Sequence, residues 1–475
     1  MNPHAEAQAV ALERITTGIE ALDGVLQGGV PRGSVVFIGG LPGTGKTILA
    51  EQMCWANARW GETVLYIGTL SEPTVKMIRF AQTFSYFDPA LVDKSVVYGD
   101  VSGALKSRDP ELVLAELNRL IEEHRPTLVV IDSFKATQDM FPDDFSFRVF
   151  TSALAVRLSI WEATALLVGE YNESEIRQRP EFAIADGIIY LHGTEDGLRQ
   201  NRLMRLMKMR GTSFFGGDHS FEISGHGITV YPRMNPTVTD EWLVPNRRLA
   251  SAIPALTEML GGGIFEATSC LITGATGTGK TLLALSFAVA EARAGGRVLY
   301  ISLEESPYQL IRDSEAFAWD LTALTESGAL DIMHISPSEL NIDQHATVIR
   351  ERAMSLGAGL VVIDSISSFE AGVPDVAKYQ SYLWAITDHF KRGGVGVIMT
   401  SESVFGDTQT ARHISLFADS IISLDQIYDG SQRKRTVRIV KMRGSSHDDN
   451  KRDLILEAPE IRIGPALESE AGHSD

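Results

Sequence analysis

This sequence has few cysteines, no long apolar run and no net positive charge. Its two cysteines, Cys54 and Cys270, lie in different halves of the chain, so we expect no structural disulfide and a reducing, cytoplasmic environment. No apolar run approaches the roughly 20 residues that span a bilayer, and the first residues lack the features of a signal peptide. The formal net charge of −18 argues against broad electrostatic capture of nucleic acid.

What the sequence does have is an internal repeat. A length of 475 residues exceeds what one hydrophobic core holds together. Three segments recur at a spacing of about 233 residues, which indicates two copies of one domain: GLPGTGKT at 40–47 and GATGTGKT at 274–281, VVIDS ending at Ser133 and Ser365, and KMRG starting at Lys208 and Lys441.

The boundary between the copies is marked by a change of composition. The segment from Tyr231 to Arg248 contains three prolines among mixed polar residues, which is typical of a linker. We therefore predict one domain at residues 1–240, a second at 241–462, and a disordered tail at 463–475.

Each copy alternates predicted strands with predicted helices. In the first copy, apolar runs predict strands at 34–40, 63–69, 128–132, 165–170 and 187–191, and helices are predicted at 46–59 and 110–124. The second copy follows the same order. This alternation predicts an α/β fold with mostly parallel central sheets, which bind ligands at the carboxyl ends of their strands.

Both copies carry the phosphate-loop pattern GxxxxGK[ST] between a predicted strand and a predicted helix, the context that the motif needs. Its glycines let backbone N–H groups turn toward a phosphate, and the helix N-terminus favours the anion. The lysines would reach the β- and γ-phosphates of ATP, and the final threonines would offer hydroxyls to Mg²⁺. The predicted ATP-binding residues are Gly43, Thr44, Gly45, Lys46, Thr47, Gly277, Thr278, Gly279, Lys280, Thr281 and Leu282.

Asp132 and Asp364 end apolar strands, where a carboxylate holds the water shell of the metal. An aspartate that merely caps the next turn is the alternative. No CxxC or HExxH spacing occurs, so we expect ATP-bound Mg²⁺ alone, near Thr47 and Thr281.

The two copies differ at the next strand. Glu304 and Glu305 end it in the second copy, where a carboxylate beside the γ-phosphate orients or deprotonates a nucleophile. A gapless offset of 234 sets Leu70 and Ser71 against them in the first copy, with Glu72 one position beyond. Either Glu72 reaches the site as its catalytic residue through a local bulge, or the first site hydrolyses ATP poorly.

Pairs of cations recur near the end of each copy. Lys208 and Arg210, like Lys441 and Arg443, are two positions apart and therefore lie on one face of a predicted strand. In a ring of ATPase domains such a pair can stabilise the γ-phosphate bound by the neighbouring subunit, as an arginine finger does. An edge strand with its charges in solvent is the alternative.

In these features the chain resembles the KaiC family, circadian-clock ATPases and autokinases, and the wider group of KaiC-like RecA-superfamily proteins. The resemblance spans residues 12–460 and rests on the doubled loops, the EES segment at 304–306, the VVIDS strands and the KMRG segments. It implies two tandem RecA-like P-loop NTPase domains in a homohexamer of two stacked rings, with ATP bound between subunits. It also implies steady hydrolysis in the first ring and reversible phosphorylation of a neighbour's side chains in the second.

The resemblance assigns roles to particular residues. Glu304, with Glu305 beside it, takes the place of the catalytic glutamate, and Trp319 is placed where an aromatic residue stacks on adenine, although a core position is the alternative. Contacts to ATP bound by a neighbouring subunit are implied for Lys208, Met209, Arg210, Arg435, Lys441, Met442, Arg443 and His447.

The family's paired phosphorylation sites have one counterpart here. Ser415 takes the serine position within 408–422, but Leu416 stands where the paired threonine would be, and Thr410 matches a threonine that relays phosphate. The resemblance thus implies serine autophosphorylation without a two-step order. Only 30 residues follow Ser445, so we expect no KaiA partner, whereas a KaiB-like partner on the first ring remains open.

Two other functions stay open. A RecA-like ring that binds DNA would need basic loops around a central pore, and the acidic balance weighs against it. An ATP-switched hexameric scaffold with little kinase activity is favoured by Leu70 and Ser71 in the first copy.

Overall fold

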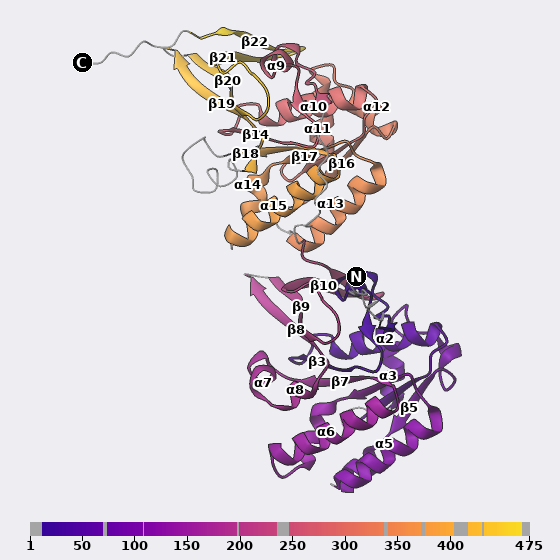
Figure 1. The fold of residues 1–475 in the computed structure, drawn as a ribbon. Helices are drawn as coiled ribbons and strands as arrows, with labels where there is room; N and C mark the ends of the chain where they lie inside the picture. Colours follow the sequence, from indigo (N-terminus) through magenta and orange to yellow (C-terminus); the bar gives the residue numbers. More distant parts are fainter. Residues whose placement is uncertain are drawn as a thin grey trace, which may run out of the picture. The chain divides into compact units, whose positions relative to one another are not determined.

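The computed structural model describes residues 12–69, 74–107, 109–196, 199–234, 247–336, 341–371, 376–402, 417–429 and 432–467. The chain forms two compact units, Met1–Arg233 and Met234–Asp475, which the colours of Figure 1 separate along the sequence. In the parts of the chain that the structure describes, no helix has both the length and the apolar character needed to cross a membrane.

The N-terminal unit is built on one nine-stranded sheet in the order β11-β10-β9-β8-β3-β7-β6-β4-β5. The strands from β5 to β8 in this order are parallel, and β9, β10 and β11 continue the sheet antiparallel. Their bounds are β3 Val35–Gly40, β4 Val64–Gly68, β5 Val96–Asp100, β6 Leu128–Asp132, β7 Thr164–Glu170, β8 Gly187–Asp196, β9 Arg199–Met209, β10 Asp218–Ser224 and β11 Gly227–Tyr231, with a separate pair β1 Arg14–Ile15 and β2 Val30–Pro31.

Helices cover both faces of this sheet (Figure 1). They are α1 Glu20–Val25, α2 Lys46–Arg59, α3 Thr74–Ala81, α4 Ser102–Ser107, α5 Pro110–His124, α6 Asp144–Ile160, α7 Glu173–Gln178 and α8 Glu181–Ile184, with 3₁₀ turns η1 Pro89–Leu91 and η2 Phe134–Met140.

Strand β3 shows why two helical layers are required. Its side chains alternate between faces, so Val36 and Ile38 join the core beneath α2, whereas Val35 and Phe37 join the core beneath α5 and α6. A parallel strand that is apolar on both sides is stable only when both sides are covered.

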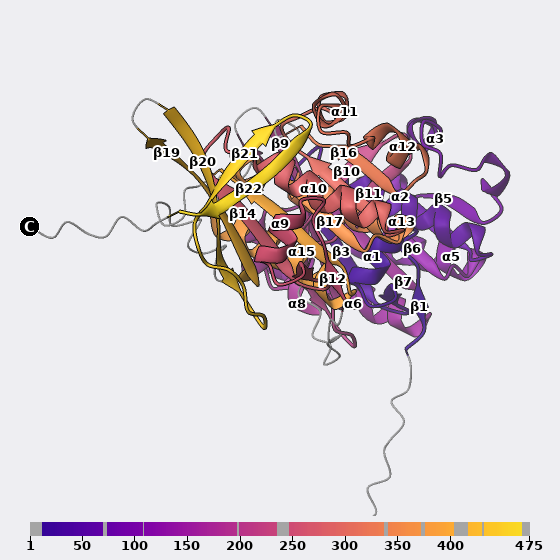
Figure 2. The ribbon, with the colours of Figure 1, turned by 90° about the horizontal axis from the view of Figure 1, so that it is seen from above.

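The C-terminal unit repeats this arrangement strand for strand, in the order β16-β15-β17-β18-β14-β19-β20-β21-β22. Figure 2 shows β19 and β20 as a long ribbon. The strands are β12 Arg248–Leu249, β13 Ile264–Phe265, β14 Ser269–Gly274, β15 Val298–Ser302, β16 Leu330–His334, β17 Leu360–Asp364, β18 Gly396–Ser401, β19 Ser420–Asp429, β20 Gln432–Met442, β21 Arg452–Glu457 and β22 Glu460–Ala466. The helices are α9 Pro254–Met259, α10 Lys280–Arg293, α11 Pro307–Glu315, α12 Leu321–Glu326, α13 Ile342–Leu356, α14 Ile366–Ala371 and α15 Val376–Arg392.

The predicted fold class is confirmed, since each repeat forms a mostly parallel RecA-like sheet between helices. The helices predicted at 46–59 and 110–124 have those bounds in α2 and α5. Strands β10 and β11 were not predicted, and they extend the sheet on its antiparallel side.

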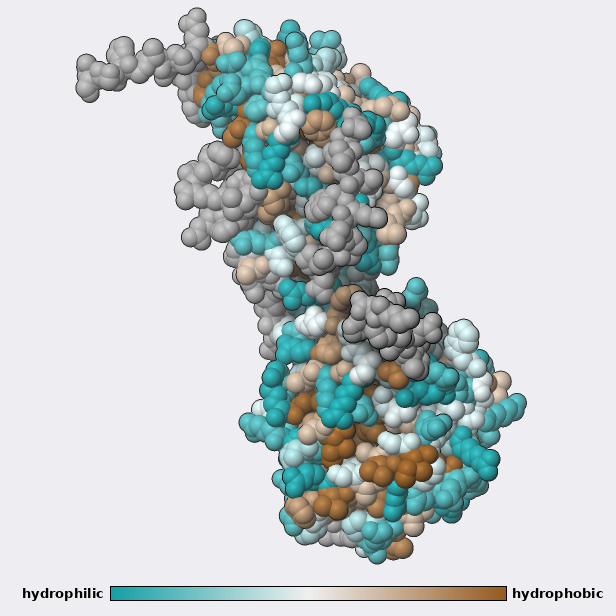
Figure 3. Space-filling view, viewed as in Figure 1, coloured by the Kyte–Doolittle hydropathy of each residue, from teal (hydrophilic) through white to brown (hydrophobic). Residues whose placement is uncertain are grey.

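One helix leaves an apolar stripe uncovered in the N-terminal unit. Phe145, Val149, Val156 and Ile160 lie along α6 and are 52–73% exposed. Figure 3 shows apolar side chains on the surface of this unit. Neighbouring apolar side chains at helical spacing usually mark a surface that another protein surface covers.

A charged cluster ties β9 to β10 in the same unit. Arg205 faces Asp218 across the two strands, and its Nε and Nη2 atoms each lie 2.7 Å from a carboxylate oxygen. His192 Nε2 is 3.0 Å from the same carboxylate. Burial works to raise the pKa of Asp218, but the bonds to His192 and Arg205 prevail and hold it far below its ordinary value.

Asp218→Asn should therefore destabilise the N-terminal unit in a pH-dependent way. Because the folded-state pKa lies below the unfolded one, the stabilisation is present above about pH 4 and is lost as the pH falls through the folded-state value. We expect a loss of about 1–3 kcal/mol at neutral pH, measured by calorimetric unfolding of wild type and variant. The deficit should shrink at about pH 3; an equal deficit at both pH values would mean that the charge is not responsible.

Candidate functional site

The phosphate loop of the N-terminal unit joins β3 to α2. Gly43 and Gly45 have φ angles of 75° and 98°, in the left-handed region that glycine adopts without strain. Thr44 Oγ1 donates a hydrogen bond to the Leu41 carbonyl over 2.8 Å, closing the turn. The two loop glycines thus take a backbone conformation that other residues adopt only with strain.

Lys46 and Thr47 stand at the start of α2. Lys46 is 8% exposed, and its Nζ atom donates to the Leu41 carbonyl over 2.8 Å. Burial lowers the pKa of Lys46, while the carboxylates of Glu170 and Asp132 oppose that shift. Thr47 Oγ1 donates to Asp132 Oδ2 over 2.7 Å, which places the hydroxyl and carboxylate that a hydrated Mg²⁺ requires side by side.

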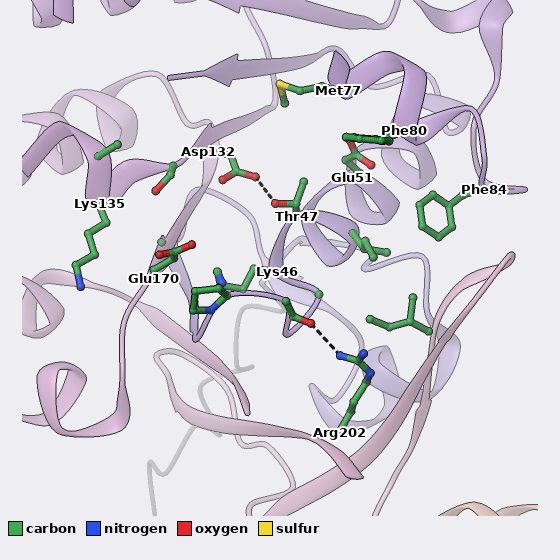
Figure 4. Close-up of a pocket in the computed structure, with 18 of the residues that line it drawn as sticks. Lys46, Thr47, Glu51, Met77, Phe80, Phe84, Asp132, Lys135, Glu170 and Arg202 are labelled. Atoms are coloured by element: carbon green, nitrogen blue, oxygen red, sulfur yellow. Dashed lines mark hydrogen bonds between the residues drawn. The ribbon is translucent and has the colours of Figure 1, made fainter. Parts of the chain in front are cut away.

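These residues form one end of a cavity of about 1110 Å³. Figure 4 shows Lys46, Thr47, Asp132 and Glu170 around that end, and Met77, Phe80 and Phe84 at the other. The volume is at the scale of small-molecule sites. A cation and a metal-binding pair beside an apolar wall suit a triphosphate joined to a flat base.

The C-terminal unit has the same loop geometry. Gly277 and Gly279 have φ angles of 75° and 103°. Lys280 Nζ donates to the Ala275 carbonyl over 3.2 Å, and burial lowers the pKa of this lysine. Thr278 Oγ1 donates to the same carbonyl over 2.7 Å.

Asp364 lies deep in this second site. It is 7% exposed and receives hydrogen bonds from Thr281, Thr400 and, over 2.7 Å, the hydroxyl of Tyr300. Burial raises the pKa of Asp364, and these hydrogen bonds limit the shift by stabilising the ionised form. The Thr281 and Asp364 pair repeats the pair of Thr47 and Asp132.

The predicted catalytic glutamates lie at this site. Glu304 Oε1 accepts hydrogen bonds from Ser365 Oγ over 2.5 Å and Ser368 Oγ over 2.7 Å. Its charge, like that of Asp364, acts on Lys280. Burial raises the pKa of Glu305, and the charge of Asp364 adds to the shift. The structure thus brings Glu304 and Asp364 together near Lys280, with Glu305 close to both carboxylates.

The donor set at both loops fits a metal that keeps most of its water. Within the residue ranges that the structure describes, no group of three or more His, Cys, Asp or Glu side chains is arranged to hold a metal ion. One hydroxyl and one carboxylate at each loop suit hydrated Mg²⁺, which binds through few protein ligands plus the phosphates of its nucleotide.

The cation pairs lie far from the loop of their own unit. Lys208 lies in register with Ile188 and Phe37, whereas Arg202 lies past Gly40, beside the loop. Six residues separate Lys208 from Arg202 on β9, a distance of roughly 20 Å. Lys208 is therefore too far from its own phosphate loop to contact it.

In both pairs the lysine donates a hydrogen bond to a backbone carbonyl. Lys208 Nζ and Arg210 Nη2 donate to the Ala183 carbonyl over 3.0 and 3.1 Å. Lys441 Nζ donates to the Ala418 carbonyl over 2.7 Å. Burial and the adjacent arginine lower the pKa of both lysines. Side-by-side cations of this kind favour an anion.

Arg435 occupies a different place from these pairs. Its Nε atom donates to the Gly277 carbonyl of its own loop over 3.0 Å. Arg202 donates to the Gly43 carbonyl over 2.9 Å, so each unit has an arginine that clamps its own loop. Arg202 was not predicted from the sequence, although the repeat offset of 233 from Arg435 leads to it.

The remaining predicted site residues differ in how deeply they are buried. Met209, Met442 and Trp319 are 6%, 7% and 6% exposed and belong to hydrophobic cores. The ring of Phe317 lies 5.6 Å from that of Trp319 and is only partly buried. His447 is half-buried in the segment after β20. Glu72, Thr410 and Ser415 lie outside the described residues.

Comparison with known proteins gives one consistent result. A family model described as "ATPase: KaiC" matches residues 15–235 and again 249–468. The chain is 28% identical over 458 residues to the circadian clock oscillator protein KaiC of Rippkaea orientalis, covering 94% of this chain and 87% of that protein. It is also 28% identical over 477 residues to the protein of that name from Synechococcus elongatus, covering 97% and 91%.

Proposed function

Because the chain belongs to the KaiC family of ATPases, we propose that each unit binds and hydrolyses Mg·ATP and that the C-terminal unit also transfers the γ-phosphate to Ser415. The observation that carries this proposal is the meeting of Glu304 and Asp364 around Lys280. A lysine for the phosphates, an aspartate for the metal and a glutamate for the nucleophile are the parts that phosphoryl transfer needs.

The proposed assembly is a homohexamer of two stacked rings with each nucleotide between two subunits. Two observations support it. Lys208 lies roughly 20 Å along β9 from the residue beside its own loop, so a neighbouring chain has to supply the ATP that it contacts. The exposed apolar stripe on α6 offers a surface for a neighbouring subunit to cover.

Phosphorylation of Ser415 is directly testable. Purified protein incubated with Mg²⁺ and γ-³²P-ATP should incorporate label that maps to Ser415, and Ser415→Ala should reduce it by at least tenfold. Glu304→Gln should have a similar effect on the rate, since general-base catalysis contributes about 100-fold or more. Phosphopeptide mass spectrometry with native mass measurement would report the acceptor, the stoichiometry and the ring size.

Thr408→Ala is the matched control for that experiment. It removes a hydroxyl of the same segment that has no predicted role, so label on Ser415 should persist. Full labelling of Ser415→Ala, or no labelling of wild type while ATP is still hydrolysed, would reduce the function to that of an ATPase.

The relatives are named circadian clock oscillator proteins. We extend this to a timing role in the cytoplasm, in which a KaiB-like partner on the N-terminal ring reads the nucleotide state. Loss of partner binding in a chain that cannot hydrolyse ATP would test this role.

A second candidate is an ATP-switched scaffold, favoured by Leu70 and Ser71 in the first repeat. In that case Lys46→Ala would dissolve the hexamer although the wild-type protein hydrolyses almost no ATP. Strong salt-dependent binding to single-stranded DNA would instead support a DNA-binding ring.

A further inference from the structure

The two nucleotide sites differ in where a carboxylate for hydrolysis can come from. Glu304 stands beside Lys280 in the C-terminal unit, but the repeat sets Leu70 and Ser71 at the matching positions of the first. Among the described residues that line the N-terminal cavity, three carry a carboxylate: Glu51, Asp132 and Glu170. These three carboxylates differ in their hydrogen bonds and in their positions within the cavity.

Asp132 and Glu51 are each held in place by other groups. Asp132 Oδ2 accepts from Thr47 Oγ1 and, over 2.9 Å, from the hydroxyl of Tyr66, which fits a metal-binding role. Glu51 is 3% exposed, follows Thr47 by one helical turn of α2, and accepts from the Tyr86 hydroxyl over 3.0 Å. Figure 4 shows Glu51 near Phe80, toward the apolar part of the cavity.

Glu170 lies at the end of the sheet where the γ-phosphate of ATP would bind. It is the last residue of β7, the strand between β3 and β6, and it pairs in register with Gly40, from which the phosphate loop begins. Figure 4 shows it beside Lys46 and Asp132. Of the two charges that oppose the lowering of the Lys46 pKa, that of Glu170 has the larger effect. The lysine that reaches the γ-phosphate therefore has this carboxylate for a neighbour.

The Glu170 carboxylate is also open to a ligand. Its residue is exposed to the cavity, and no hydrogen bond or ion pair joins it to another of the described residues. A water molecule that enters with ATP can occupy its lone pairs without displacing a protein partner.

The C-terminal unit has a glutamate at the equivalent position, but the hydrogen bonding of its carboxylate differs. Glu402 follows β18, 232 positions after Glu170, and its charge also acts on Lys280. There Thr276 Oγ1 of the phosphate loop donates to Glu402 Oε1 over 3.0 Å. The matching loop position in the N-terminal unit is Pro42, whose side chain has no donor. The carboxylate is thus tied to the loop where Glu304 is present and is not tied where that glutamate is missing.

We propose that Glu170 is the catalytic carboxylate of the N-terminal unit, in place of the missing glutamate pair. This rests on the proposed hydrolysis of ATP by that unit. Glu170 orients a water molecule and accepts its proton while the water oxygen bonds to the γ-phosphorus. The bond from that phosphorus to the bridging oxygen breaks, ADP leaves with the bond's electron pair, and the proton passes from Glu170 to solvent.

The test uses a full-length chain in which the C-terminal site binds ATP but does not turn it over. We call the variant with Glu304→Gln and Glu305→Gln the C-silent chain, and Lys46→Ala added to it must remove its remaining hydrolysis. Glu170→Gln in the C-silent chain should lower kcat about 100-fold. KM should change by no more than about threefold, since the substitution removes a charge but no phosphate contact.

Glu51→Gln is the matched comparison, because glutamine still accepts the hydrogen bond of Tyr86. It should change kcat far less than Glu170→Gln does. Glu402→Gln in a Lys46→Ala chain should likewise lower turnover by the C-terminal unit less, because Glu304 remains. This ordering separates catalysis from a general effect of neutralising a carboxylate in the cavity.

The outcomes distinguish this inference from the function on which it rests. A C-silent chain that binds two ATP molecules but hydrolyses none would overturn N-terminal hydrolysis, and this inference with it. If the C-silent chain hydrolyses ATP and Glu170→Gln keeps its rate, or Glu51→Gln is the variant that loses it, only the assignment to Glu170 is wrong.

Discussion

A chain carrying Lys280→Ala should bind one ATP molecule instead of two, and so should a chain carrying Lys46→Ala. Each substitution should weaken binding at its own loop at least about 100-fold, or about 2.8 kcal/mol. Isothermal titration with a non-hydrolysable ATP analogue and Mg²⁺ measures both stoichiometry and affinity.

The size of this effect follows from the charges around each lysine. Glu170 and Asp132 surround Lys46, and Glu402, Asp364 and Glu304 surround Lys280. Without the lysine, a triphosphate would enter a half-buried site beside carboxylates and without the cation that reaches its phosphates, where effective dielectric screening is weak. Mg²⁺ would offset part of this repulsion but cannot replace the contact to the γ-phosphate.

Lys106→Ala provides the control, since Lys106 is exposed on α4 and does not line the cavity. It should leave both sites intact. If Lys46→Ala or Lys280→Ala still bound two nucleotides with unchanged affinity, the loop concerned would not be a phosphate site.

The sequence predicts best where a residue's neighbours in the chain are also its neighbours in space. Helix α2 has its predicted bounds because the loop glycines fix its start and Gly61, at a φ of 88° after the C-cap residue Trp60, ends it. Strand β10, with the sequence DHSFEIS, has no such local signal. It pairs with β9 through contacts that only the folded sheet provides.

The residues of the site also differ in how far the sequence predicts them. Lys46, Thr47 and the metal-binding aspartate follow from motif and strand ends. Glu170 has no motif of its own, and its importance appears only when β7 is seen to lie between β3 and β6. Trp319 could be located from the sequence, but its role could not. An aromatic side chain after a helix can face either a ligand or the core, and the sequence does not distinguish the two.

Replacing Arg210 with alanine in the C-silent chain should lower ATP turnover by the N-terminal unit about 1,000-fold, the lower range for an arginine finger. The Arg210 side chain is 57% exposed, next to Lys208 and beyond the end of β9 that lies away from its own loop. Its partner Asp186, 3.3 Å away, is a surface contact that a phosphate can replace. Steady-state phosphate release measures the effect.

Mixing two inactive chains tests whether Arg210 contacts the ATP that a neighbouring subunit binds. A Lys46→Ala chain has no functional N-terminal loop but supplies Arg210, and an Arg210→Ala chain has the loop but no finger. If the arginine acts across the interface, equal co-expression of the two in the C-silent background should restore about a quarter of parental activity, because one interface in four pairs an intact loop with an intact finger. If Arg210 acted on its own loop, no mixture would recover activity, because no chain would contain both parts. Recovery near a quarter would therefore establish that the site is shared between chains, and its absence would leave Lys208 and Arg210 as the charged edge of a strand.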